Sequence, residues 1–192
     1  MTEHVVTANS KLTSYDYSEH LELIDNCIED VKYTLTEYPD FQIYGKKAIQ
    51  HRCIAFYSND SEGYTYSRKL EKSKKLTDNL NNLMILINNN FNADFNGILI
   101  NLYKSGNDYI SSHSDDEKEI SSTGVLSISV GAVRKFRIRD KITRKIVKDI
   151  PTKSYSVINM TGDFQKEFLH EIPIEKKIKD VRISFTFRKH DK

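Results

Sequence analysis

The chain has 192 residues, 38% of them hydrophobic and 29% charged, and a formal net charge of +2. This length suits one domain with a sizeable core, and the composition excludes an intrinsically disordered chain. No apolar run approaches the length of a membrane span, and residues 1–10 lack the pattern of a signal peptide. We therefore expect a soluble intracellular protein of the cytoplasm or nucleus, with no membrane partner and a monomer as the default state.

Two packing helices are predicted in the first half of the chain. Apolar residues recur there at helical spacing in two groups: Leu21, Ile24, Ile28, Val31 and Leu35, then Leu76, Leu80, Leu83, Met84 and Ile87. Asp16 or Ser18 would cap the first helix. Cys27 and Cys53 have neither metal-type spacing nor a disulfide framework, so we expect reduced thiols.

From Gly97 onward the pattern changes to short β segments separated by turn residues. The expected strands are Ile98–Tyr103, Tyr109–His113, Val125–Val130, Lys135–Arg139, Ile146–Ile150, Ser154–Met160, Phe168–Ile172 and Val181–Arg188. Many short strands in a row predict a barrel or jelly roll. The fold class is thus mainly β with flanking helices (α+β), and the N-terminal helices would brace one outer face.

The last expected strand alternates apolar and polar residues. Arg182, Ser184, Thr186 and Arg188 share one face because side chains alternate with period two along a strand. A surface strand explains this alternation equally well. If the polar face instead points into a small barrel, the two arginines need anionic partners, and a dicarboxylate ligand would supply them.

Three residues form a candidate metal site. His113 and Asp115 are an i, i+2 pair at the end of one expected strand, and His170 lies on another. Two imidazoles and one carboxylate form the facial triad of non-haem Fe(II) oxygenases. A zinc hydrolase uses the same ligand types. The two arginines favour the oxygenase, since hydrolytic zinc does not require them.

Positive charge is concentrated in the C-terminal third. Residues 131–192 carry 17 Lys and Arg against 8 Asp and Glu, and the density is highest between Arg134 and Lys148. Such a stretch could neutralise nucleic-acid phosphates. A solvated hairpin with charged edges accounts for it equally well.

Several ordered motifs resemble the AlkB family of 2-oxoglutarate dioxygenases between about Arg52 and Arg188. They are the residues of 101–117 (Asn-Leu-Tyr-x-x-Gly-x-Asp-Tyr-Ile-x-x-His-Ser-Asp-Asp-Glu), 127–136 (Ser-Ile-Ser-Val-Gly-Ala-x-Arg-x-Phe) and 182–188 (Arg-Ile-Ser-Phe-Thr-Phe-Arg). The resemblance implies a double-stranded β-helix (jelly roll) and a single dioxygenase domain over residues 1–192. Residues 1–50 would be an N-terminal helical extension, 51–96 a nucleotide-recognition lid and bracing helix, and 97–190 the jelly-roll core.

The resemblance also implies roles for individual residues. His113, Asp115 and His170 would hold Fe(II), and the cosubstrate 2-oxoglutarate would bind beside it. Arg182 would pair with its distal carboxylate. The other residues on the 2-oxoglutarate site would be Asn101, Tyr103, Ser184, Thr186 and Arg188. Asn101 and Arg188 would hold the end that chelates iron.

On the substrate side, the resemblance implies an aromatic lid and a few polar contacts. Tyr64 and Tyr66 lie in the lid segment, and Tyr57 stands where the family often has an aromatic residue that stacks on the target base. Glu117 matches an acidic position near the base edge, and Arg134 matches a basic residue near the substrate. The plain alternatives are incidental loop tyrosines, a solvated glutamate and an ion-paired arginine.

The implied activity is oxidative demethylation of N-alkylated bases, of the N1-methyladenine and N3-methylcytosine type, in alkylated DNA or RNA. The reaction would consume O2 and 2-oxoglutarate and release formaldehyde, succinate and CO2. The alternatives are the same chemistry on RNA methyladenine or a protein side chain, and a catalytically silent nucleic-acid-binding module. The sequence departs from the family at Ser184, commonly Asn, and at Phe168, commonly Trp, which leaves the base preference open.

Overall fold

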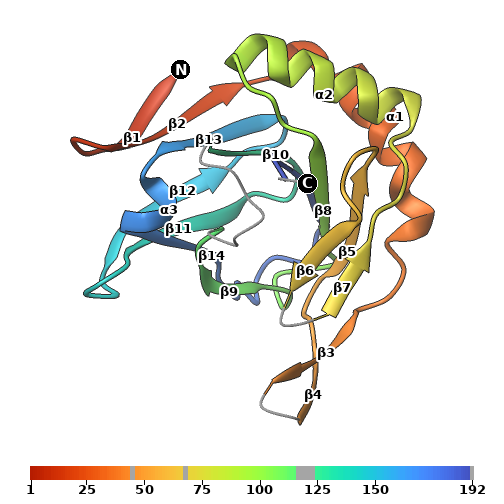
Figure 1. Ribbon diagram of the computed structural model, residues 1–192. Coiled ribbons are helices and arrows are strands. Elements are labelled where there is room, and N and C mark those ends of the chain that lie inside the picture. The colour runs from red at the N-terminus through yellow and green to blue at the C-terminus, as the bar shows by residue number, and fades with distance from the viewer. Residues whose placement is uncertain (44–45, 67–68, 116–123, 191–192) are drawn as a thin grey trace.

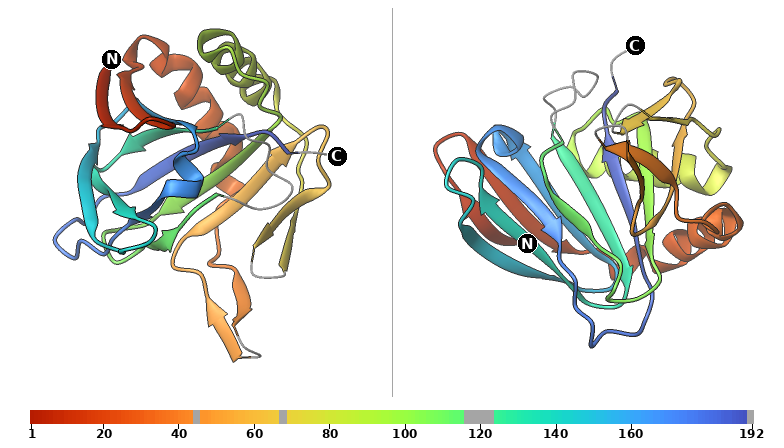
Figure 2. Two further views of the ribbon diagram at one scale, coloured as in Figure 1. Left: turned by 60° about the vertical axis from the view of Figure 1, so that its left-hand side comes forward. Right: turned by 90° about the horizontal axis from the view of Figure 1, so that it is seen from below.

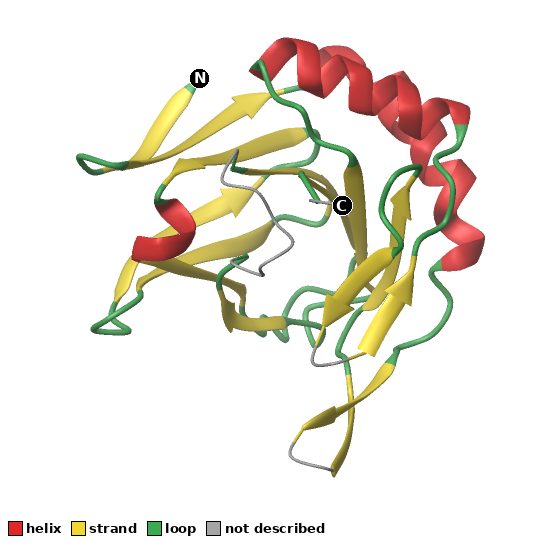
Figure 3. Ribbon diagram, in the orientation of Figure 1, coloured by secondary structure: helices red, strands yellow, loops and turns green. Residues whose placement is uncertain are grey.

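Two antiparallel sheets facing each other form the centre of the computed structural model, which describes residues 1–43, 46–66, 69–115 and 124–190. Helices cover the outer face of the larger sheet (Figures 1 and 3). This is the expected mainly β jelly roll, braced on one outer face by helices.

The larger sheet has the strand order β1-β2-β13-β10-β15-β8-β5. Its strands are β1 (Thr2–Val6), β2 (Ser10–Asp16), β5 (Cys53–Ser58), β8 (Gly97–Tyr103), β10 (Val125–Gly131), β13 (Ser156–Gly162) and β15 (Arg182–Arg188). The smaller sheet has the order β12-β11-β14-β9. Its strands are β9 (Ile110–His113), β11 (Arg134–Asp140), β12 (Ile146–Thr152) and β14 (Phe168–Ile172). Every strand expected after Gly97 is present, with ends shifted by at most two residues.

Within the larger sheet, β15 has one apolar face and one polar face. In β15, Ile183, Phe185 and Phe187 pack in a core cluster with the buried residues of the helices. The residues between them therefore point toward the smaller sheet, because side chains alternate across a strand. A second core cluster, which includes Phe136, Ile138 and Ile172, fills the space between the two sheets.

The two expected helices are α1 (Leu21–Val31) and α2 (Asp78–Phe91), and they pack against each other. Short helical turns, η1 (Ser18–His20) and η2 (Lys32–Thr34), flank α1, so Leu35 lies just beyond the helical segment. A short helix, α3 (Phe164–Glu167), precedes β14. Thr77 caps α2 by accepting a hydrogen bond from Leu80 N at 3.2 Å.

The expectation that residues 1–50 form a helical extension is wrong for most of that segment. β1 and β2 belong to the larger sheet, where β2 pairs with β13. β3 (Asp40–Ile43) and β4 (Lys46–Ile49) form a hairpin that projects from the body of the molecule (Figures 1 and 2). The apolar pattern of β2 is weak, and its partner lies far along the chain, so no local signal indicated the pairing.

A second hairpin, β6 (Gly63–Tyr66) and β7 (Lys69–Lys72), occupies the expected lid segment. It follows the edge strand β5 and is anchored to it, since Ser58 N donates to the Lys74 carbonyl at 2.9 Å. Among the described residues, no helix is both long and apolar enough to cross a membrane. Cys27 and Cys53 are buried free thiols, as expected, and burial raises the pKa of Cys27 to about 12.

Candidate active site

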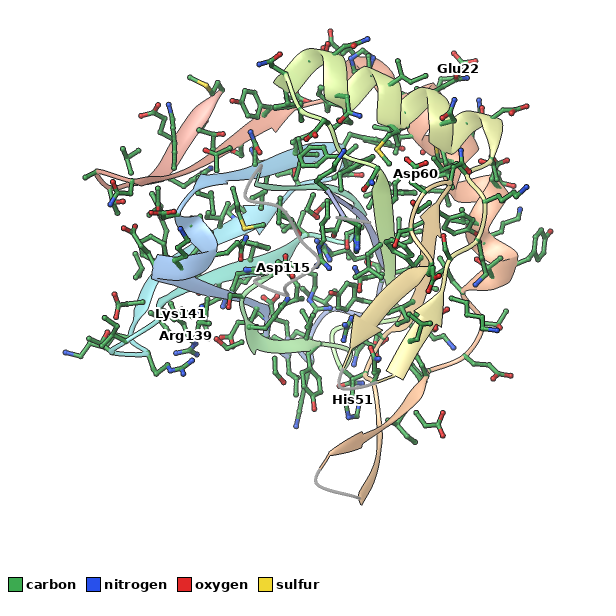
Figure 4. The ribbon with its side chains drawn as sticks, viewed as in Figure 1. Glu22, His51, Asp60, Asp115, Arg139 and Lys141 are labelled. Atoms are coloured by element: carbon green, nitrogen blue, oxygen red, sulfur yellow. The ribbon has the colours of Figure 1, made fainter. Side chains whose placement is uncertain are left out.

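The three candidate metal ligands meet between the sheets. β9 pairs with β14 so that His113 lies opposite His170, and Asp115 follows two residues after β9 ends. One ligand atom from each of the three side chains lies within 4.8 Å of the others. Asp115 carboxylate oxygens lie 3.7 Å from His113 Nε2 and 3.5 Å from His170 Nε2. Figure 4 places Asp115 in the space between the two sheets.

Neighbouring groups orient these ligands. His113 Nδ1 lies 2.8 Å from the Ser111 carbonyl oxygen. A carbonyl only accepts, so Nδ1 carries the proton and Nε2 is left to bind a metal. The backbone N–H of Asp115 donates to Gln165 Oε1 at 2.9 Å, which fixes the turn that presents the carboxylate. The His170 ring stacks on Phe136 with centroids 5.2 Å apart.

The electrostatics of the site favour the protonation states that a metal requires. Burial opposes ionisation of Asp115, but the charge of Arg188 and the two imidazoles outweigh it and lower the Asp115 pKa to about 2. Desolvation, followed by the neighbouring His113, lowers the pKa of His170 to about 3. Desolvation also lowers the pKa of His113. At neutral pH the site therefore presents one carboxylate and two neutral imidazoles, which suits a divalent cation.

The polar faces of β8 and β15 line the same pocket as these ligands. Tyr103 lies opposite Arg182, and Asn101 lies opposite Ser184. The pocket is lined by Leu99, Asn101, Tyr103, Ile110, His113, Asp115, Ser127, Phe136, Met160, His170, Glu171, Ile172, Arg182, Ser184, Thr186 and Arg188. The structure thus brings together every residue that the sequence assigned to iron and 2-oxoglutarate.

Arg182 lies at the end of the pocket away from the metal ligands and is 2% exposed. Its Nη2 donates to Ser129 Oγ at 2.8 Å, its Nε donates to Thr152 Oγ1 at 3.2 Å, and its guanidinium lies 5.1 Å from the Tyr103 ring centroid. Its Nη1 is buried and has no hydrogen-bond partner among the described residues. A buried cation held only by neutral groups favours an anionic ligand. The donor set therefore fits the distal carboxylate of 2-oxoglutarate.

At the other end of β15, Arg188 lies beside the metal ligands. Its Nη2 donates to Asp115 Oδ1 at 2.6 Å, and both side chains are buried. The second carboxylate oxygen, Asp115 Oδ2, is buried and has no hydrogen-bond partner among the described residues. It lies toward His170 Nε2, where a bound cation would complete its coordination. The triad thus fits a metal ion.

The sequence did not identify three groups that support this pocket. Ser129 and Thr152 hold Arg182, and Arg52 donates from Nε to Asn101 Oδ1 at 2.8 Å. The alternation of Ser127 and Ser129 with apolar residues in β10 could have indicated that Ser129 faces the pocket. Arg52 is a single arginine in an irregular segment, so no sequence pattern indicates its role.

Two of the expected substrate residues lie elsewhere. Tyr57 is 3% exposed and belongs to the core cluster with the helices, and its hydroxyl lies 3.0 Å from Thr34 Oγ1. It does not line the pocket. In β5 the alternate residues Ile54 and Phe56 take the inner face with Leu99, which leaves Tyr57 on the outer face.

Arg134 is buried as well, at 1% exposed. It donates to the carbonyl oxygens of Ser105, Asp108 and Pro173 at 3.1, 2.8 and 2.7 Å and pairs with Glu175 at 3.2 Å. Arg134 therefore holds three backbone segments together. It is neither the substrate contact nor the surface ion pair that the sequence suggested.

The remaining substrate candidates are Tyr64, Tyr66 and Glu117. Tyr64 and Tyr66 lie on β6, opposite Glu71 and Lys69 of β7. Glu117 lies outside the described residues.

The basic stretch forms the β11–β12 hairpin, and part of its charge is neutralised internally. Arg137 donates to both oxygens of Asp149 at 2.7 and 2.8 Å, and Arg139 donates twice to Glu171. Arg144 and Lys145, at the hairpin turn, are exposed. The β11–β12 hairpin is therefore charged, and Lys135, Arg144, Lys145 and Lys148 are exposed on it.

Comparisons with known proteins agree with this geometry. Residues 6–188 match the family described as the 2OG-Fe(II) oxygenase superfamily. The human protein named DNA oxidative demethylase ALKBH2 is 29% identical over 176 residues, which are 88% of this chain and 67% of that protein. Human alpha-ketoglutarate-dependent dioxygenase alkB homolog 3 is 32% identical over 149 residues, 72% of this chain and 51% of that protein.

A solved structure, that of OsALKBH1, has a similar fold. It superimposes with a TM-score of 0.63 at 13% sequence identity and covers 98% of this chain and 100% of the other. The chain spans about two thirds of the length of ALKBH2 and half of that of alkB homolog 3.

Proposed function

This chain belongs to the 2OG-Fe(II) oxygenase superfamily and is an AlkB homologue that uses Fe(II) and 2-oxoglutarate. From this premise, we propose that it demethylates N-alkylated bases in DNA or RNA. The proposed substrates are of the N1-methyladenine and N3-methylcytosine type. The observation that carries the proposal is one pocket holding the His113, Asp115 and His170 triad at one end and the buried Arg182 at the other. The name of the similar ALKBH2 supports a nucleic-acid substrate.

In this proposal His113, Asp115 and His170 hold Fe(II). The bound metal, with 2-oxoglutarate and O2, supplies oxidation of the methyl C–H bond, and succinate, CO2 and formaldehyde are released. Arg188 keeps Asp115 ionised through its hydrogen bond. Phe136 packs flat on the His170 ring and restricts its rotation.

The 2-oxoglutarate contacts follow the length of the pocket. Arg182 binds the distal carboxylate as a rigid fork of donors, with Tyr103 beside it and Ser184 and Thr186 along the same face. Asn101 binds the chelating end near the metal, together with Arg188. Arg182 at one end, and Asn101 with Arg188 at the other, would thus position the cosubstrate along the pocket.

The substrate contacts are proposed for the β6–β7 hairpin, where Tyr64 and Tyr66 would stack on an extruded base. Glu117 would contact the edge of that base. Lesions that break base pairing flip more cheaply, which gives one source of selectivity. Arg144 and Lys145 would contribute to phosphate binding from the exposed hairpin turn.

Mass spectrometry of a single-stranded oligonucleotide with one N1-methyladenine or N3-methylcytosine tests this proposal. The reaction contains the protein, Fe(II), ascorbate and 2-oxoglutarate, with and without O2. We expect loss of the methyl group only in the complete mixture. The variant Asp115→Ala serves as the control for contaminating activity.

Other outcomes point to the alternative functions. Succinate production without demethylation would move the search to RNA methyladenine or a protein side chain. Absence of both would favour a silent nucleic-acid-binding module. Oxygen-independent hydrolysis would indicate a zinc hydrolase, a reading that leaves the buried Arg182 without a ligand.

A further inference from the structure

Arg52 does not itself line the pocket, but it contacts Asn101, which does. It stands directly before β5, which is the edge strand of the larger sheet, and it is 3% exposed. Its Nε donates to Asn101 Oδ1 at 2.8 Å, and both side chains are buried. β5 and β8 pair with Ile54 opposite Asn101, so Arg52 reaches Asn101 diagonally across the start of β5.

This contact decides which way the Asn101 amide faces. A guanidinium group has only donors, so the amide oxygen must point toward Arg52. The amide nitrogen, with its two N–H donors, then points away from Arg52. Asn101 lines the pocket, so these donors are available to an acceptor inside it.

We infer that Arg52 is a positioning residue that locks the Asn101 amide with its N–H donors toward the carboxylate at the chelating end of 2-oxoglutarate. The inference rests on the proposed role of Asn101. Without Arg52 the amide can turn, and half of its orientations present an oxygen to the carboxylate, which is repulsive. Arg52 therefore controls cosubstrate affinity without having to touch the cosubstrate.

Arg52 also brings a positive charge next to Asn101, because its guanidinium contacts the Asn101 amide directly. This charge adds positive potential at the wall of the pocket, where it would attract a carboxylate. Two mechanisms, the amide lock and the added charge, have to be separated by experiment.

Arg52→Gln and Arg52→Met form a matched pair for that purpose. Gln Nε2 lies the same number of bonds from the backbone as Arg Nε and also donates, whereas Met has the same reach and no donor. The readout is the dissociation constant of 2-oxoglutarate, measured by calorimetry on protein loaded with Mn(II) in the absence of O2. We expect Arg52→Met to weaken binding about tenfold and Arg52→Gln to stay within about threefold of the parent chain.

A double-mutant cycle tests whether the effect passes through Asn101. The double variant of Arg52→Met and Asn101→Ala should bind 2-oxoglutarate no more weakly than Asn101→Ala alone. Arg137→Ala, which removes a half-buried cation paired with Asp149 and outside the pocket lining, is the control and should leave affinity unchanged. Mn(II) affinity and the thermal unfolding midpoint of each variant verify that the triad and the fold persist.

The inference is overturned if Arg52→Gln and Arg52→Met weaken binding equally, since charge would then be the cause, or if the cycle is additive. Unchanged affinity in Arg52→Met would overturn it as well. If Arg52→Met does not fold, the comparison of Arg52→Gln alone with the parent still decides, because a tenfold loss there excludes the amide lock. None of these readouts uses a nucleic acid, so failure of the proposed substrate leaves the result intact.

Discussion

At the residue scale, the site depends on three polar side chains kept in defined charge states, of which Asp115 and His170 are buried and His113 is half-buried. Asp115 stays ionised although it is 3% exposed, because Arg188 and the imidazoles lower its pKa to about 2. An unpaired buried carboxylate would instead become protonated. Desolvation lowers the pKa of His113 and His170, which keeps both imidazoles neutral and able to bind a metal. The three side chains therefore have the charge states that a metal requires even when no ion is bound.

Asp115→Ala should abolish turnover through loss of iron. The reason is that one of three ligands disappears and the remaining pair of imidazoles binds Fe(II) weakly. Metal content by mass spectrometry and succinate production are measured together. Asp94→Ala, at an exposed carboxylate, is the control and should retain both. An Asp115→Ala protein that keeps iron and activity would refute the ligand assignment.

Arg182→Ala should raise the 2-oxoglutarate concentration needed for half-maximal rate by about 10- to 100-fold, the loss of a charge-assisted hydrogen-bonded pair. Oligonucleotide affinity should change far less, because Arg182 lies deep in the pocket. Steady-state kinetics and fluorescence anisotropy give the two quantities. Arg182→Lys should recover part of the loss, since it keeps the charge but not the fork. Equal effects on cosubstrate and oligonucleotide would contradict this role.

At the element scale, α3 directly precedes β14, the strand of His170, and is hydrogen-bonded to the turn after β9 that carries Asp115. Gln165 accepts the Asp115 N–H, and Lys141 Nζ donates to the Gln165 carbonyl and to Ser114 Oγ, both at 2.9 Å. Figure 4 shows Lys141 on the same side of the molecule as Arg139, with Asp115 toward the centre. The turn that carries Asp115 is thus held by the segment that leads into the strand of His170.

Gln165→Ala should weaken Mn(II) binding about tenfold, in line with other residues that support metal ligands. Gln165→Glu keeps the acceptor for Asp115 N–H and should retain most of the affinity. Titration of the apoprotein with Mn(II), followed by electron paramagnetic resonance, measures both. If the two variants bind Mn(II) equally well, the hydrogen bond does not support the ligand turn.

The bracing helices contribute stability and no chemistry. Thr77 caps α2 and also donates to Asp30 Oδ2 on α1 at 2.6 Å. Thr77→Ala should therefore lower the free energy of unfolding by about 1 kcal/mol, the usual loss on removing an N-cap. Urea unfolding measures this difference, with exposed Thr36→Ala as the control. A changed affinity for 2-oxoglutarate in Thr77→Ala would show that the helices influence the site.

At the scale of the whole molecule, the site joins the two sheets. The metal ligands come from β9 and β14 of the smaller sheet and the turn after β9, whereas the proposed 2-oxoglutarate contacts come from β8 and β15 of the larger one. A metal with its cosubstrate would therefore link elements that otherwise touch mainly through apolar packing. Ligand binding to the folded state alone stabilises it by mass action.

Mn(II) and 2-oxoglutarate together should raise the thermal unfolding midpoint. At about 100 times the dissociation constant, the added stability is about 2.7 kcal/mol, which corresponds to several degrees for a chain of this size. Differential scanning fluorimetry without O2 measures the shift, and a chelator should reverse it. Asp115→Ala should show no shift. A shift that survives in that variant would place the bound metal elsewhere.

Local patterns in the sequence determined the strands after Gly97, both bracing helices and the facial triad. The strands, the helices and the i, i+2 pair of His113 and Asp115 depend on neighbours within a few residues. The third ligand, His170, was added from its own predicted strand, far along the chain. Alternation in β15 likewise predicted two unlike faces. The family resemblance predicted which residues bind 2-oxoglutarate, and the structure places those residues in one pocket.

Tertiary structure alone decided which face of each strand is the inside. Period two separates two faces of β15 but does not say which one meets the pocket. Packing of Ile183, Phe185 and Phe187 under the helices turns the arginines inward. The same packing puts Tyr57 on the outer face of β5. Which face of a strand is buried depends on the elements that pack against it, and here those elements come from distant parts of the chain. The partners of Arg52 and of β2 are likewise distant in sequence.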